Sequence, residues 1–317
     1  MAKALGLDDY LHGLKNQDRG ILAKAISLIE SSKSEDQLLA KKLLAQLVKA
    51  RTKSFRIGIT GIPGAGKSTF INQLGSLYCD HEFLTAVLTI DPSSTKSGGS
   101  ILGDKTRMQE LSFRTNAFIR PSPSLGHLGG VAARTRETIL LCEAFGFERI
   151  LIESVGVGQS EQEISSLCDL TILLSISGAG DDLQGIKRGL LEAADWILVN
   201  KADGENLARA EKTKQELLMA LKILKHEDVV VDCVSSLKKD HVAAVYHRLE
   251  DYFHKNKKEI ADRRRKQNIH WFEKLVEQEL LFQFRNNKDL QDKIQKIKDE
   301  ILSGAHPLNK IMDLKLN

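Results

Sequence analysis

Short apolar runs alternate with amphipathic stretches along most of the chain, and this alternation is the first guide to its fold. Between Phe55 and about Phe253, strand-like runs are separated by segments that carry apolar residues at helical spacing. This pattern predicts an α/β fold in which a mostly parallel sheet has helices on both faces, and ligands of such sheets bind at the carboxyl ends of the strands. The predicted strands cover residues 55–60, 84–90, 116–120, 149–153, 169–176, 195–200 and 229–234.

Both ends of the chain have purely helical patterns. Asp18 is a predicted helix cap, and Ser34 with Gln37 forms a predicted capping box before a second helix. Two apolar stripes near the C-terminus either pack on their own domain or bury against a second subunit, and we expect the second. The stripes are Ile269, Phe272, Val276 and Leu280, and then Leu290, Ile294, Ile297 and Ile301. We predict an N-terminal helical extension (1–53), a P-loop domain (54–256) and a C-terminal dimerisation arm (257–317).

One glycine-rich segment has the full pattern of a phosphate-binding loop, with a predicted strand before it and an amphipathic stretch after it. Such a loop cradles an anion, because backbone N–H groups converge on it and the helix dipole favours negative charge. Lys67 is expected to reach the β- and γ-phosphates, and the Ser68 hydroxyl to hold Mg²⁺. The loop consists of Gly61, Ile62, Pro63, Gly64, Ala65, Gly66, Lys67, Ser68 and Thr69.

A second motif, Asn200-Lys201-Ala202-Asp203, ends the sixth predicted strand and indicates which base binds. The Asp203 carboxylate can accept hydrogen bonds from the ring N–H and the exocyclic amine of guanine, whereas adenine lacks this donor pair. Lys201 is expected to pack along the base, and Asn200 to tie its own loop to the phosphate loop. We therefore predict GTP rather than ATP. The segment Ser235-Ser236-Leu237 lies where a backbone N–H commonly contacts guanine O6.

Acidic residues end two more predicted strands. Many nucleotidases place an acid that reaches Mg²⁺ through water where Glu153 stands, and Asp91 with Asp104 suits metal binding and water activation. Val157 occupies the position of the Ras-like glutamine, so Gln159, Asp91 and a residue of the glycine-rich segment 178–188 remain candidates for positioning the attacking water. The candidate catalytic residues are Lys67, Asp91, Asp104, Glu153 and Gln159, and the candidate metal ligands are Ser68, Asp91, Asp104 and Glu153. We expect slow intrinsic turnover that a partner stimulates.

The amino-acid composition mainly excludes certain partners, metal sites and locations. With 42% hydrophobic and 28% charged residues and a net charge of +4, the chain is typical of a soluble globular protein and gives no reason to expect a nucleic-acid partner. The basic run Arg263–Lys266 is interpreted as a solvated helix face. Four scattered cysteines predict a reducing cytosol, with neither a disulfide framework nor a structural zinc. Because no apolar run reaches 18 residues, we expect a cytoplasmic protein without a membrane span.

With these residues in view, the chain resembles the accessory GTPases of B12-dependent acyl-CoA mutases. This methylmalonyl-CoA mutase chaperone family is also labelled as arginine/ornithine transport ATPases. The resemblance implies a P-loop GTPase of the dimer-forming SIMIBI class, with Asp91 and Asp104 in switch I, and with switch II at 156–161 and switch III at 178–188. It further implies homodimerisation through C-terminal helices, binding of the mutase, and gating of adenosylcobalamin loading and protection. The matching stretches are 91–108, 120–124, 129–137, 153–161 and 178–187.

Two rival functions stay open. A nickel or zinc metallochaperone GTPase has a similar core, but usually carries a histidine-rich tail or clustered cysteines, and neither occurs in this sequence. A transport-system kinase fits the older family label but is expected to use ATP, whereas the Asn200–Asp203 motif favours guanine. The sequence departs from the family pattern at Ser154, Ser177 and His127.

Overall fold

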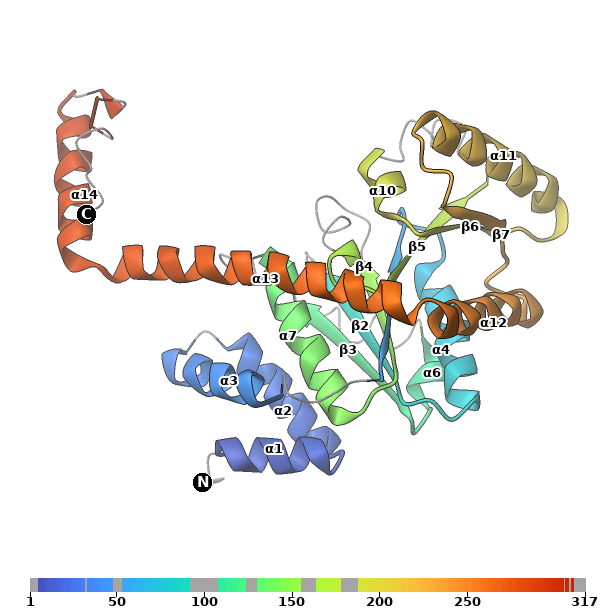
Figure 1. Ribbon diagram of the computed structural model, residues 1–317, viewed down its shortest axis with the longest axis horizontal. Coiled ribbons are helices and arrows are strands. Elements are labelled where there is room, and N and C mark those ends of the chain that lie inside the picture. The colour runs from blue at the N-terminus through green and yellow to red at the C-terminus, as the bar shows by residue number, and fades with distance from the viewer. Residues whose placement is uncertain are drawn as a thin grey trace. The chain divides into compact units, whose positions relative to one another are not determined.

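A seven-stranded sheet is the framework of the protein, and every strand pair in it is parallel (Figure 1). The computed structural model describes residues 5–31, 33–47, 53–91, 108–123, 130–154, 164–177, 188–304, 306–307 and 309–310. The chain divides into two compact units, Met1–Arg265 and Lys266–Asn317, and the whole sheet belongs to the first. Along the sheet the strand order is β3-β2-β4-β1-β5-β6-β7, so the first strand in sequence lies at the centre.

All seven predicted strands are confirmed, and each begins within one residue of its expected start. Their bounds are β1 Phe55–Thr60, β2 Thr85–Asp91, β3 Ala117–Pro123, β4 Arg149–Ser154, β5 Leu170–Ile176, β6 Trp196–Asn200 and β7 Val230–Cys233. The prediction ended the third strand at Arg120, but β3 continues through Pro121 to Pro123. Proline is tolerated there because β3 is an edge strand that pairs only with β2 in the described sheet, so the missing N–H breaks no ladder on the outer side.

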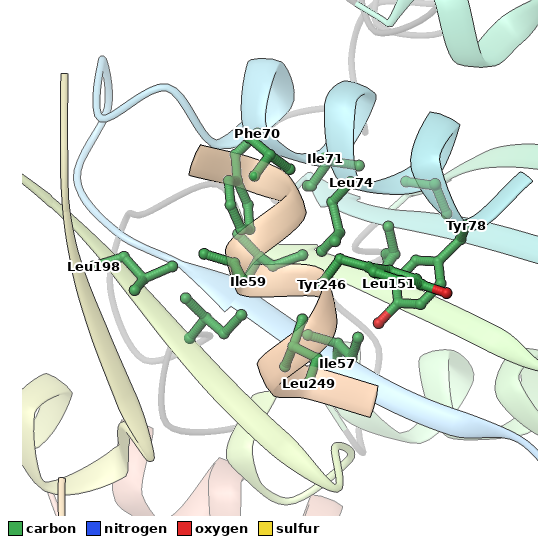
Figure 2. Close-up of a cluster of buried hydrophobic side chains, with 14 of the residues drawn as sticks. Ile57, Ile59, Phe70, Ile71, Leu74, Tyr78, Leu151, Leu198, Tyr246 and Leu249 are labelled. Carbon is green, nitrogen blue, oxygen red and sulfur yellow. The ribbon is translucent and has the colours of Figure 1, made fainter. Parts of the chain in front are cut away.

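One face of the sheet is covered by α4 (Lys67–Asp80), α6 (Gln109–Ser112) and α12 (Lys239–Lys255). Figure 2 shows Ile57, Ile59 and Leu151 from the strands against side chains of α4 and α12. These side chains are fully or almost fully buried, and the labelled helix residues are Phe70, Ile71, Leu74, Tyr78, Tyr246 and Leu249. This packing holds α4 rigidly behind β1, and the loop between those two elements carries the phosphate-binding motif.

Two groups of helices cover the opposite face of the sheet. Helix α7 (Gly130–Phe145) lies on β2 and β4, and the N-terminal helices α1 (Leu7–Lys15), α2 (Arg19–Glu30) and α3 (Ser34–Leu47) pack around it in one buried cluster (Figure 1). Helices α10 (Arg188–Ala193) and α11 (Leu207–Ile223) cover β5, β6 and β7, and the short 3₁₀ helix η1 (Gly204–Asn206) contacts α11. The predicted arrangement of helices on both faces is therefore confirmed.

The N-terminal helix caps were predicted with mixed success. Asp18 caps α2 as expected, accepting hydrogen bonds from the N–H groups of Gly20 and Ile21 at 2.7 and 3.1 Å. The capping box at Ser34 is wrong, because Ser34 is already the first residue of α3. The carbonyl of Lys33 accepts the first helical hydrogen bond, from the Gln37 N–H at 3.0 Å. The helix thus begins one residue earlier than a Ser34 cap requires.

The basic run in α13 (Lys257–Asn286) is not a solvated face, and that interpretation is wrong for two of its arginines. Arg264 binds the fully buried Asp169, which precedes β5, with Nε–Oδ1 and Nη2–Oδ2 distances of 2.7 and 2.5 Å. Arg263 binds Asp195, which precedes β6, at 2.8 and 2.5 Å. Burial lowers the pKa of Arg264, but the hydrogen bonds and charge of Asp169 outweigh this and raise it above its ordinary value. We call these four residues the arginine clasp.

The second unit contains the remainder of α13 and α14 (Lys288–Leu302). Side chains of the first predicted stripe lie on α13 and are exposed: Ile269 by 62%, Phe272 by 64%, Val276 by 39% and Leu280 by 60%. The second stripe lies on α14, where Leu290, Ile294, Ile297 and Ile301 are half-buried. The stripes are therefore helical, as predicted, and the first presents large apolar side chains to solvent within this chain.

Candidate functional site

The phosphate-binding motif joins the central strand β1 to the start of α4, as its pattern predicts (Figure 1). Three of its glycines have positive φ angles: 145° at Gly61, 81° at Gly64 and 90° at Gly66. A Cβ on Gly61 would lie 2.2 Å from the carbonyl oxygen of Leu174 in β5. The loop can therefore lie this close to the neighbouring strand only because glycine occupies that position.

Lys67 and Ser68 are the first two residues of α4, and both side chains point to polar partners at this edge of the sheet. The buried Lys67 ammonium donates to the carbonyls of Gly61 and Ile62 at 2.7 and 3.1 Å. The Ser68 hydroxyl donates to Oε1 of Glu153 at 3.0 Å. Lys67 is thus held inside its own loop, with its charge within reach of any anion that the loop binds.

The pair of Ser68 and Glu153 fits the Mg²⁺ that P-loop GTPases generally use. Glu153 lies near the end of β4, next to β1, and is 8% exposed. A hydroxyl and a carboxylate are the hard oxygen ligands that Mg²⁺ prefers, and the ion usually adds waters and substrate phosphates to them. Asp91 is the last residue of β2, while Asp104 and Gln159 lie outside the described residues. Their predicted catalytic and metal roles stay predictions.

Asn200 connects three segments that are far apart in the sequence. Its Nδ2 donates to the carbonyl of Ala65 in the phosphate loop at 2.7 Å. Its Oδ1 accepts from the N–H and the hydroxyl of Ser236 at 3.0 and 2.8 Å. Next to it, Lys201 is exposed and adopts a left-handed φ of 59°, and Asp203 is half-exposed. The structure thus brings the base motif, the phosphate loop and the segment 235–237 together at the carboxyl edge of the sheet.

Two contacts of this edge were missed by the sequence analysis. The buried Thr60 hydroxyl accepts a hydrogen bond from Ser154, 2.8 Å away, which links the ends of β1 and β4. On the other side, Nδ1 of His241 accepts from the N–H of Ser235 at 3.1 Å. Neither Thr60 nor His241 belongs to a recognisable motif. Their positions, at the end of a strand and at the start of the helix after β7, were the only signal in the sequence.

Replacing Gly61 with alanine is expected to destabilise the fold by about 3 kcal/mol or more, because the new Cβ meets the backbone of β5 and the φ of 145° is strained. Gly64→Ala is the matched control, since its φ is also positive but nothing lies within 4 Å of the added Cβ. It should cost only about 1–2 kcal/mol from backbone strain. Urea unfolding without nucleotide measures both, and equal losses would contradict the steric explanation.

Comparison with known proteins decides the family. The family model of the methylmalonyl-CoA mutase-associated GTPase MeaB matches residues 22–289. The chain belongs to the MeaB family. It is therefore a P-loop GTPase, and its fold, its phosphate loop and the names of its relatives agree on this.

Individual relatives are similar over most of their length. The chain is 38% identical to the mouse mitochondrial methylmalonic aciduria type A homolog, and the match covers 98% of this chain and 79% of that protein. It is 41% identical to the GTPase ArgK of Escherichia coli, covering 89% of this chain and 87% of that protein. Among solved structures, a LAO/AO transport system kinase aligns with a TM-score of 0.74 and 31% identity, covering 99% and 98% of the two chains. Among the described residues of this MeaB-family protein, no helix is long and apolar enough to cross a membrane.

Proposed function

We propose that this protein is a GTP-hydrolysing chaperone of a B12-dependent acyl-CoA mutase of the methylmalonyl-CoA mutase type. The family description, which names mutase association, supports the partner. The Asn200 network supports the nucleotide, because one side chain joins the phosphate loop to the predicted guanine-binding segments. Binding of GTP orders the switch segments around the phosphates, hydrolysis releases them, and the mutase accepts or keeps its adenosylcobalamin accordingly. The scattered thiols fit a cytoplasmic location.

Each site residue has a defined role in this proposal. Lys67 leaves its loop carbonyls to neutralise charge that develops on the transferred phosphoryl group. Ser68 and Glu153, already in contact, would hold Mg²⁺ directly or through water, together with Asp91 or Asp104. The bound ion would supply positive charge that offsets the negative charge of the phosphates. Gln159 is a candidate for orienting the attacking water. The absence of the Ras-like glutamine at Val157 is the reason to expect slow turnover without a partner.

A direct test uses the purified protein and a purified methylmalonyl-CoA mutase. GTP hydrolysis is measured alone and with the mutase, and complex formation is followed with GDP or a non-hydrolysable GTP analogue. We expect slow hydrolysis that the mutase stimulates, and complex stability that depends on the nucleotide. Lys67→Ala is the control that should bind the mutase without hydrolysing GTP. Hydrolysis unaffected by the mutase, with no complex in either state, would remove the chaperone assignment. Displacement of GTP by equimolar ATP would instead favour the transport-system kinase.

We also propose a homodimer formed through the C-terminal arm. The supporting observation is the exposed stripe on α13, since apolar side chains recurring on one helix face are usually buried against a partner. Replacing Phe272 and Val276 with glutamate should convert a dimer into a monomer in sedimentation velocity. Glutamate at the neighbouring position Lys274 is the control. A monomeric unmodified protein, at concentrations well above those of the assay and with or without nucleotide, would contradict this proposal.

A further inference from the structure

A histidine in the first turn of α12 contacts the segment that precedes this helix. Helix α12 begins at Lys239, and His241, two residues later, is half-buried. Its Nδ1 accepts a hydrogen bond from the N–H of Ser235 at 3.1 Å. This bond requires the neutral tautomer that carries its proton on Nε2. The side chain therefore folds back from the helix onto the segment 235–237, which adjoins the predicted base-binding motif.

Two of the three backbone N–H groups of this segment donate to partners among the described residues. The Ser236 N–H donates to Asn200 Oδ1, and the Lys238 N–H donates to the carbonyl of Ser235 at 3.1 Å. With the Ser235 N–H donating to His241, the N–H of Leu237 is the one backbone donor of the segment without an acceptor among the described residues. Ser235 and Ser236 are buried and their N–H groups are paired, whereas Leu237 is 76% exposed, so its N–H is accessible from outside the fold. The bonding pattern thus singles out the Leu237 N–H as the group left for a ligand.

The contact with His241 matters because Ser235 is almost completely buried, with a relative exposure of 1%. Its hydroxyl oxygen is already a buried polar atom without a hydrogen-bond partner in the described part of the chain. Removing the imidazole would leave the Ser235 N–H unpaired as well, and the segment would have to rearrange to recover an acceptor. A rearrangement at Ser235 would displace Leu237, two residues along the same turn.

We propose that His241 is a positioning residue for guanine recognition. By accepting from Ser235, it fixes the turn so that the N–H of Leu237 is directed at O6 of the base. This inference rests on the proposed function, because it takes the segment beside Asn200 to be the guanine site. His241 itself does not touch the nucleotide. Its contribution is selective for bases that carry an acceptor at position 6, which separates it from a purely structural part in the start of α12.

The experiment compares dissociation constants for three nucleoside diphosphates. GDP and inosine diphosphate both carry O6, whereas the diphosphate of 2-aminopurine riboside has no oxygen at that position. His241→Ala should weaken GDP and inosine diphosphate equally, on the order of 10-fold, because one buried hydrogen bond is lost. The 2-aminopurine nucleotide should bind both proteins equally. His241→Asn should restore GDP affinity to within about 2-fold, because Oδ1 of asparagine can accept in place of Nδ1. His247→Ala, at an exposed position on the same helix, is the control.

Three outcomes would overturn this inference while leaving the proposed function intact. The first is GDP binding by His241→Ala that equals that of the unmodified protein. The second is an equal loss for all three nucleotides, and the third is a loss that asparagine does not restore, because either of these results indicates general disruption of the fold. If the unmodified protein binds no guanine nucleotide in the presence of Mg²⁺, the proposed function itself is wrong, and the positioning role fails with it.

Discussion

Asparagine in place of Asp203 is expected to change the preferred base from guanine to xanthine. In the proposed site the carboxylate would accept from the ring N–H and the exocyclic amine of guanine, and an amide nitrogen cannot accept from that amine. Xanthine has a carbonyl in place of the amine, so the asparagine Nδ2 can donate to it while Oδ1 still accepts from the ring N–H. Sites built around such polar pairs discriminate by roughly 10⁴-fold, and GDP affinity should fall on that scale while xanthosine diphosphate gains affinity.

Fluorescence titration with labelled diphosphates measures both affinities. Glu205→Gln is the control, since Glu205 is an exposed acid two positions along the chain and should leave both constants unchanged. A variant that loses GDP without gaining xanthosine diphosphate would show that Asp203 supports the loop and does not contact the base. Unchanged GDP binding would remove Asp203 from the site altogether.

Alanine in place of Asp169 is expected to be among the most destabilising single changes in the sheet. This buried carboxylate accepts from the Arg264 guanidinium and, at 2.9 Å, from the backbone N–H of Arg56. Its removal leaves the Arg56 N–H without its acceptor and takes the nearest carboxylate from the Arg264 guanidinium, which keeps the Ser54 carbonyl at 2.8 Å and Glu143 at 3.8 Å. Loss of such a buried carboxylate typically costs about 3–5 kcal/mol. The Asp169→Asn variant keeps an amide oxygen that can accept from the Arg56 N–H, so it should lose less.

Urea unfolding followed by circular dichroism gives the free energies. Asp232→Ala is a matched control, because Asp232 also binds two basic side chains, Lys214 and Arg248, but its own side chain is 41% exposed. Solvent screening should keep that loss below about 1 kcal/mol. If Asp169→Ala and Asp232→Ala lower the free energy of unfolding equally, burial does not decide the strength of the arginine clasp.

The strands could be predicted because each is a short apolar run bounded by polar residues, and a central parallel strand is buried on both faces. All six residues of β1 and all six of β4 are buried, for example. The position of the site motifs was also predictable, since each motif is contiguous and its place at a strand end follows from the fold. Asn200 lies at the end of its strand and contacts the phosphate loop 135 residues away.

What the sequence could not show are the partners of polar side chains that no motif marks. Arg263 and Arg264 resemble any exposed basic run until the fold places Asp195 and Asp169 beside them, 68 and 95 residues earlier in the chain. The contact of His241 is local, yet no propensity rule marks a histidine that turns back to a preceding loop. In both cases the apolar pattern predicts the helix. It does not predict which group the arginine or histidine side chain on that helix will bind.

The prolines at the end of β3 bear on how the protein behaves at high concentration. An outer strand with a full row of unpaired N–H groups is a template for another chain, and growth from such edges leads to aggregation. Pro121 and Pro123 remove two donors from the carboxyl end of that row. The opposite edge, β7, is only four residues long. Both edges of the sheet are therefore poor templates for strand addition, which lowers the tendency of the folded protein to aggregate.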